Sequence, residues 1–205
     1  MLTLDVTDRF GTMSHIYFHS CREHYEDFKK YSVQLGPKLS MLRQGKCRAP
    51  EVFLVLNNIE RYWASAVVFG AMCLEAFIYD YAATYFSDTY VRRYLDKLDL
   101  KAKWVVIPKL VTGKKFPTGS KAFQNLHRLV SERNLLVHHK SKPSKKNLVE
   151  VVTMAAEYKD KIAKTRTKLN PYEAVVAVLT ELRKLEDDDE TRVLNWELID
   201  EDILE

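Results

Sequence analysis

The segment 131–140 places an arginine and a histidine five positions apart. Arg133 supplies a permanent cation whose planar fork of donors suits phosphate oxygens. His138 supplies a group that can take up or release a proton near neutral pH. These are two of the groups needed to cleave RNA without a metal, because a cation stabilises charge on the phosphate while the ribose 2′-hydroxyl attacks and a histidine moves protons.

Helix geometry does not bring these two side chains to one face. Positions five apart are separated by about 140° around the axis, whereas Asn134 and His138 are four apart and share a face. A joint site requires a deformed helix end, a bent Arg133 side chain or a second copy of the chain, and the last option predicts a homodimer. Spacing alone favours an ordinary surface, with Arg133 near Glu132 and His138 at a helix C-terminus.

The elements that must position this segment are predicted to be helices. The clearest begins near Pro50, which suits a first helical turn, and runs through Tyr85 with apolar residues at helical spacing. An earlier helix is predicted to end at Gly36-Pro37. No convincing strand pair is found, so the predicted fold class is all-α, an antiparallel helical bundle. The other predicted helices are 14–35, 88–98, 101–111 (kinked or shortened at Pro108), 120–139, 148–164 and 171–185.

Composition predicts a soluble cytoplasmic protein. Of the 205 residues, 46% are hydrophobic, which is enough to form a substantial core. Three cysteines without metal-type spacing indicate reduced thiols. The most apolar stretch, 62–74, is shorter than the roughly 20 residues of a membrane span, and no targeting segment is visible. We expect no membrane contact, and we divide the chain into an N-terminal extension (1–49, partly helical), a helical domain (50–185) and an acidic tail (186–205).

The net charge of +4 conceals an uneven distribution. The tail carries ten acidic residues and one basic residue, or −9, which leaves +13 on the rest of the chain. A body this basic is compatible with polyanion binding, and Lys140, Lys142 and Lys145 are the expected substrate-binding residues beside the motif. We expect the tail to dock on the basic body or on a partner and to compete with RNA. A solvated, solubilising tail is an equal alternative.

A metal site near the N-terminus is the competing hypothesis. His15 and His19 lie four apart on a predicted helix, with Cys21 and His24 nearby. This is not H-E-x-x-H and no second cluster completes it, so an exposed polar helix face is favoured, and neither a metal nor a cofactor is predicted. The chain has no G-x-x-x-x-G-K-[ST], G-x-G-x-x-G or G-x-S-x-G, so NTPase, dinucleotide-binding and hydrolase-elbow functions lack support.

The order of features resembles the HEPN superfamily of small α-helical domains, over residues 50–142. Those domains pair a long helix bearing a Leu-Glu-Ala-type segment with a later helix ending in R-[polar]-x-x-x-H, the one specific motif. The corresponding segments here are Leu74-Glu75-Ala76-Phe77, Lys103-Trp104, Phe123-Gln124-Asn125-Leu126 and Arg133-Asn134-Leu135-Leu136-Val137-His138.

The resemblance implies a four-helix core, with extra N- and C-terminal helices here, that dimerises and places two motifs across one cleft. Many relatives are metal-independent endoribonucleases of toxin–antitoxin and other defence systems, so an antitoxin or defence partner is implied. Arg133 would stabilise the phosphate, His138 would be the general acid or base, and Asn134 would orient the histidine or contact the substrate. Glu75 would hold Arg133 in place. Some relatives carry a modifiable tyrosine where Lys140 stands, so that control is not supported.

Two other functions remain open. Some members of the superfamily have lost activity, so the chain is alternatively a catalytically inactive domain that binds RNA, a nucleotide or a protein partner. A weaker alternative is a helical adaptor between proteins that never meets nucleic acid. The first alternative differs from the ribonuclease only in whether Arg133 and His138 face a common substrate site.

Overall fold

A computed structural model describes residues 12–138 and 169–186. Within these ranges every regular element is helical, which confirms the predicted all-α class. The elements are α1 (Ser14–Arg43), α2 (Ala49–Phe86), α3 (Asp88–Tyr90), the π-helix η1 (Val91–Leu95), α4 (Leu100–Thr112), α5 (Lys121–Val137) and α7 (Pro171–Arg183). The predicted helix 148–164, the lysines 140, 142 and 145, and the acidic tail beyond residue 186 lie outside the described residues.

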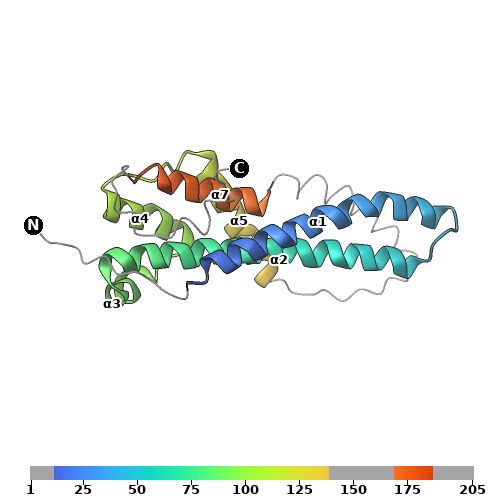
Figure 1. Cartoon of the computed structure of the whole chain (residues 1–205), viewed down its shortest axis with the longest axis horizontal. Helices are drawn as coiled ribbons and strands as arrows, with labels where there is room; N and C mark the ends of the chain where they lie inside the picture. Colours follow the sequence, from blue (N-terminus) through green and yellow to red (C-terminus); the bar gives the residue numbers. More distant parts are fainter. Residues whose placement is uncertain (1–11, 139–168, 187–205) are drawn as a thin grey trace, which may run out of the picture.

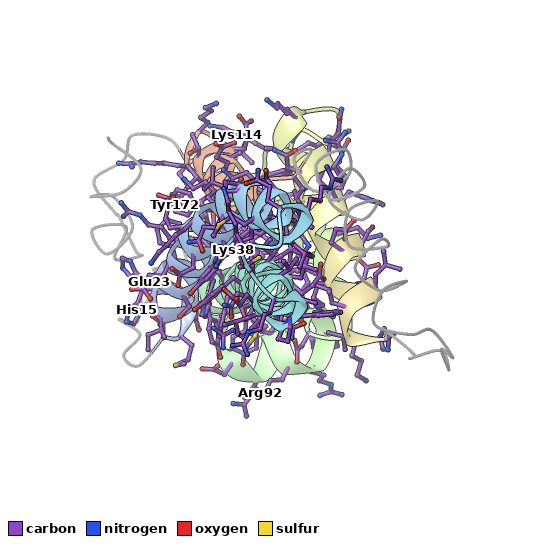
Figure 2. All side chains as sticks on the ribbon, turned by 90° about the vertical axis from the view of Figure 1, so that its right-hand side faces the viewer. His15, Glu23, Lys38, Arg92, Lys114 and Tyr172 are labelled. Atoms are coloured by element: carbon purple, nitrogen blue, oxygen red, sulfur yellow. The ribbon has the colours of Figure 1, made fainter. Side chains whose placement is uncertain are left out.

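Helices α1 and α2 form a long antiparallel hairpin (Figure 1). At 1.5 Å per residue, the 38 residues of α2 extend for about 57 Å. Helices α4, α5 and α7 gather beside the half of α2 that leads to α3 (Figure 1), and α2 contacts each of them. Viewed along the hairpin, α7 lies at the upper left and α5 at the right of the α1–α2 pair (Figure 2). Residues of 1–49 and of 50–185 share one hydrophobic core.

The predicted end of the first helix at Gly36-Pro37 is wrong, because α1 continues to Arg43. Pro37 cannot donate a hydrogen bond to the carbonyl four residues earlier. That carbonyl belongs to Val33, whose side chain is exposed, so it lies on the solvent side of the helix. Leu35 and Leu39, on the opposite side, are buried in the core. Packing against α2 therefore outweighs the local helix-breaking signal.

Side-chain caps begin three of the helices, close to the starts predicted at 101, 120 and 171. Asp99, Ser120 and Asn170 each accept a hydrogen bond from the backbone N–H three residues later. Ser87, which precedes α3, makes no such bond and has φ 75°. The helix predicted for 88–98 is a short α-helix followed by the π-helix η1, and Pro108 does not shorten α4.

Gly70 lies where four helices converge. A Cβ added there would be 3.2 Å from Sγ of Cys21 on α1, 3.4 Å from Val175 on α7 and 3.6 Å from Leu129 on α5. The missing side chain on α2 allows this close approach.

Of the described helices, α2 is long and apolar enough to cross a membrane by length and composition, and half of its most apolar window is buried in the protein. A core helix of a soluble protein meets the same criterion.

Candidate functional site

The guanidinium of Arg133 is held from two directions. Its Nη2 donates to Oε2 of Glu75 on α2 at 3.1 Å, and its Nη1 donates to Oδ1 of the adjacent Asn134 at 3.1 Å. The side chain is 28% exposed, so it is neither fully buried nor free in solvent. An arginine has five N–H donors, and three remain beyond these two bonds. The expected contact between Glu75 and Arg133 is thus present, and the catalytic role of either residue stays a prediction.

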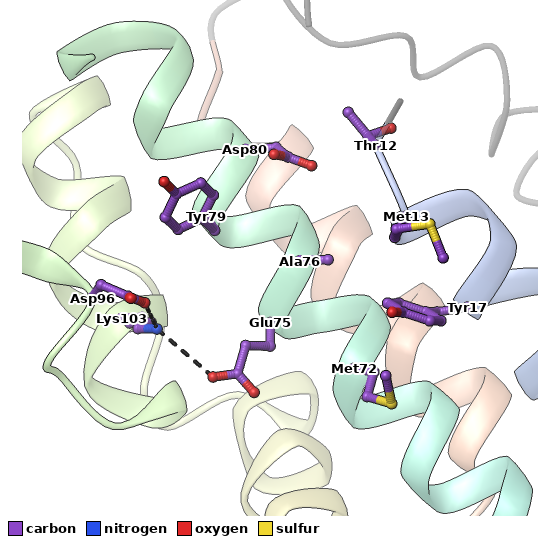
Figure 3. A pocket seen from close by; sticks show the side chains of 10 residues that line it. All are labelled: Thr12, Met13, Tyr17, Met72, Glu75, Ala76, Tyr79, Asp80, Asp96 and Lys103. Atoms are coloured by element: carbon purple, nitrogen blue, oxygen red, sulfur yellow. Dashed lines mark hydrogen bonds and ion pairs between the residues drawn. The ribbon is translucent and has the colours of Figure 1, made fainter. Parts of the chain in front are cut away.

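Glu75 also faces a second cation, Lys103 on α4. Nζ of Lys103 lies 3.7 Å from Oε1 of Glu75 and 2.7 Å from Oδ1 of Asp96, which follows η1 (Figure 3). Lys103 is only 4% exposed. Arg133, Glu75, Lys103 and Asp96 thus alternate in charge and draw on α5, α2, α4 and the residue after η1. We call these four residues the ion-pair chain.

Aromatic packing places Lys103 beside Glu75. Nε1 of Trp104, the next residue on α4, donates to the buried carbonyl of Leu74 on α2 at 3.3 Å. The ring of Trp104 also stacks on Phe77 at a centroid distance of 6.3 Å. Both contacts hold α4 against the turn of α2 that carries Glu75. The segments 74–77 and 103–104, which carry part of the family resemblance, therefore meet in space.

Among the described residues, the His138 side chain makes no hydrogen bond or ion pair with this group. It is the residue after the last turn of α5, and its backbone N–H donates to the carbonyl of Asn134 at 3.0 Å. Within the part of the chain that the structure describes, no hydrogen bond joins its side chain to Arg133 or Asn134. The Asn134 amide oxygen accepts from Arg133, and its role toward the histidine or the substrate stays a prediction. One copy of the chain therefore brings together Arg133, Asn134 and Glu75, but not His138.

The surface around the motif is partly apolar. Leu135 is 67% exposed and Val137 is 58% exposed, although both lie within the last turn of α5. Single exposed apolar residues are ordinary. Here Leu135 and Val137 lie between the exposed Asn134 and His138, within the five residues 134–138. The end of α5 thus presents a mixed apolar and polar surface.

An open pocket of about 400 Å³ lies on the other side of Glu75, between the start of α1 and the second half of α2 (Figure 3). Glu75, Lys103 and Asp96 line it, so the ion-pair chain forms part of its wall. Arg133 does not line it. The remaining lining residues are Thr12, Met13, Tyr17, Met72, Ala76, Tyr79 and Asp80.

The N-terminal histidines and cysteine do not form a metal site. Among the described residues, no group of three or more His, Cys, Asp and Glu side chains is arranged to hold a metal ion. Cys21 is buried in the core, so this side of α1 is not wholly the exposed polar face that we expected. The ring of His24 stacks on Phe69 at 5.4 Å and lies 5.7 Å from Tyr62, in the seam between α1 and α2.

Sequence reasoning missed the roles of Lys103 and Asp96 in this arrangement. A signal was present, because Lys103 falls at helical spacing among Leu100, Trp104 and Ile107, all of which are buried. A lysine on an apolar helix face needs a carboxylate partner nearby. The position of that partner, Asp96, depends on how η1 turns back toward α4, which spacing does not disclose.

Comparisons of the chain with protein-family models, with curated proteins and with solved structures find no match.

Proposed function

We propose that the protein is a metal-independent endoribonuclease of the HEPN type, acting as a homodimer in a toxin or defence role. The observation that carries this proposal is the ion pair between Glu75 and Arg133. It holds the guanidinium of the R-N-x-x-x-H motif in one place and leaves three N–H donors for phosphate oxygens. A preorganised cation of this kind stabilises the charge that develops on a phosphate under attack.

The proposed reaction forms a bond between the ribose 2′-oxygen and phosphorus and breaks the bond to the 5′-oxygen. A base removes the 2′-hydroxyl proton, an acid protonates the leaving 5′-oxygen, and the products are a 2′,3′-cyclic phosphate and a 5′-hydroxyl. No redox partner is needed. His138 is the proposed proton carrier, because imidazole accepts and donates protons near neutral pH.

A second copy of the chain supplies the proximity that one copy lacks. The His138 side chain is not bonded to Arg133 within the described chain, so we propose that the histidine of one copy faces the arginine of the other. The exposed Leu135 and Val137 give this contact an apolar component. Basic residues 140, 142 and 145 would then follow the motif on both copies and bind the RNA backbone.

The test is incubation of the purified protein with RNA and with the all-deoxy oligonucleotide of the same sequence, with and without a chelator. We expect cyclic-phosphate products from RNA alone, unaffected by the chelator, and at least a hundredfold loss (about 3 kcal/mol of barrier) in Arg133→Ala and His138→Ala. His127→Ala, an exposed histidine on the same helix, is the matched control. Loss of cleavage on chelation, or full activity of His138→Ala, would contradict the proposal.

Mixing the two inactive variants tests the shared site. If arginine and histidine come from different copies, a heterodimer of Arg133→Ala with His138→Ala retains one intact site and recovers part of the activity. Light scattering at micromolar concentration should show a dimer. A monomer, or variants that do not complement each other, would show that each site belongs to one chain.

The alternative proposal is a catalytically inactive domain of the same kind that binds RNA, a nucleotide or a protein partner. The lack of a hydrogen bond between the His138 side chain and Arg133 in the described chain favours it, because an arginine without a proton carrier beside it can bind phosphate without cleaving the RNA. The same assay discriminates the two functions. Binding of RNA that Arg133→Ala abolishes, together with intact RNA at long incubation, would support the binding domain.

A further inference from the structure

The buried ammonium of Lys103 needs an explanation that packing does not provide. Removing a charge from water is costly, and an apolar side chain at such a site is often as stable as a buried ion pair or more stable. Lys103 occupies the same helix face as the buried Leu100, Trp104 and Ile107. A fourth apolar residue would therefore suit this face. The lysine instead presents its ammonium to Asp96 and Glu75.

The two oxygens of Glu75 face different cations. Oε2 accepts from Arg133 at 3.1 Å, while Oε1 lies 3.7 Å from Nζ of Lys103. Rotation of the carboxylate would break at least one of these interactions, so the two cations together restrict its orientation. A glutamate held by Arg133 alone would keep more rotamer freedom, and the guanidinium would move with it.

Lys103 can restrict Glu75 because Lys103 is itself buried and bonded at its ammonium. It is enclosed among core side chains, and its ammonium is anchored on Asp96 at 2.7 Å. The other end of the ion-pair chain, Arg133, is the more exposed cation. The buried Lys103 therefore restricts the movement of the ion-pair chain. The restriction is needed at the more exposed Arg133, where a substrate would bind. Second-layer contacts of this kind commonly decide how well a primary group is aimed.

We propose that Lys103 is a positioning residue that fixes the guanidinium of Arg133 by holding Glu75, without itself touching the substrate. Its effect on RNA cleavage rests on the proposed function, whereas its effect on the order of Arg133 does not. Asp96 contributes to the same positioning, since its carboxylate bonds the ammonium of Lys103. The remaining donors of Arg133 are thus aimed at one place on the surface.

The variants for the test are Lys103→Met, which removes the charge and keeps most of the chain length, and Lys103→Arg, which keeps a cation. Lys101→Met is the matched control, because Lys101 lies on the same helix and reaches α5 through His127 at 3.3 Å rather than through Glu75. Asp96→Asn loosens the anchor at an exposed side chain and replaces Lys103→Met if that variant does not fold.

The first readout is the Nε–Hε signal of Arg133 in nuclear magnetic resonance spectra of the full chain, assigned by its loss in Arg133→Lys. Restricted rotation and slow exchange of this proton are expected in the wild type, in Lys101→Met and in Lys103→Arg. In Lys103→Met we expect exchange at least about fivefold faster. An unchanged Arg133 signal in Lys103→Met, or in Asp96→Asn where the first variant is unfolded, overturns the inference.

The second readout is cleavage in a double-mutant cycle with Glu75→Gln. We expect Lys103→Met to lower kcat by about tenfold or more with KM within about threefold, and to change the rate less than about twofold when Glu75→Gln is already present. Equal losses in both backgrounds would show that Lys103 does not act through Glu75. If the wild type does not cleave RNA, the proposed function fails, and the resonance of Arg133 still decides the positioning role.

Discussion

At the scale of single residues, burial decides which side chains can react. Cys21 and Cys73 lie in the core of the bundle, whereas Cys47 is half-buried between α1 and α2, where its thiol donates to the Lys38 carbonyl at 3.5 Å. Burial raises the pKa of the Cys21 thiol to about 12, and it raises the pKa of Cys73 as well. Both groups therefore remain thiols throughout the neutral range, and the thiolate is the nucleophilic form.

We expect iodoacetamide at pH 8 to modify Cys47 while sparing Cys21 and Cys73. Mass spectrometry of the native protein should show a single rapid addition, and the same reagent in concentrated urea should modify all three cysteines. Raising the pH to 9 should still leave Cys21 and Cys73 unmodified, because burial raises the pKa of both thiols, that of Cys21 to about 12. Rapid native modification of Cys21 would contradict the buried position of this residue beside Gly70.

At the scale of elements, the first turn of α2 is stabilised by charge. Oε1 of Glu51 accepts from the Arg48 backbone N–H at 3.0 Å, and Oε2 lies 3.0 Å from Nζ of Lys38 on α1. The first of these bonds, followed by the second, lowers the pKa of Glu51 below its ordinary value of 4.5. A carboxylate with a lowered pKa in the folded protein favours folding above its ordinary pKa, and this contribution is lost as the pH falls through the lowered value.

We expect Glu51→Gln to lower the melting temperature at pH 7 and to have progressively less effect as the pH falls below 4.5. The difference should vanish once Glu51 is protonated in both folded and unfolded chains. Glu23→Gln, at an exposed position on α1, is the matched control. Thermal unfolding followed by circular dichroism from pH 3 to 7 measures both. A difference between wild type and Glu51→Gln that is constant over this range would show that the carboxylate charge is not responsible.

The helices differ in how far local sequence determined them. The caps at Asp99, Ser120 and Asn170 are local interactions over three residues, so the sequence predicted those starts correctly. The end of α1 was mispredicted because Gly36-Pro37 is a local signal, whereas the continuation depends on burial of side chains against α2. The candidate site divides in the same way. The motif and its glutamate were predicted from a resemblance, but the link through Lys103 requires three helices and the turn after η1.

At the scale of the whole molecule, four helices of the bundle meet at Gly70, a residue without a side chain. Gly70 lets α1, α5 and α7 approach α2 together, and the tightest neighbour of an added Cβ would be Cys21 Sγ at 3.2 Å. Glycine inside a helix costs about 1 kcal/mol relative to alanine. This cost of a glycine in the centre of α2 is therefore offset by the closer packing of the other helices. A larger residue would have to separate them.

We expect Gly70→Val to reduce the free energy of unfolding by about 2 kcal/mol or more, because overpacking typically costs 1–3 kcal/mol and here it involves three neighbouring helices. Urea denaturation measures the change. Gly119→Val is the matched control, since a Cβ there meets no atom within 4 Å. Gly70→Val combined with Cys21→Ala should recover part of the loss. Equal stability of Gly70→Val and the wild type would show that the helices can separate at no cost.

The short connection between the two longest helices also orders the events of folding. Residues 44–48 join α1 to α2, so contacts near this turn close small loops and form with little loss of chain entropy. Contacts of α4 and α5 with Glu75 close loops of 28 and 58 residues. We expect pulse-labelling hydrogen exchange to protect amides of α1 and α2 before those of α5. The contact of Arg133 with Glu75 would then form only after the α1–α2 hairpin has folded.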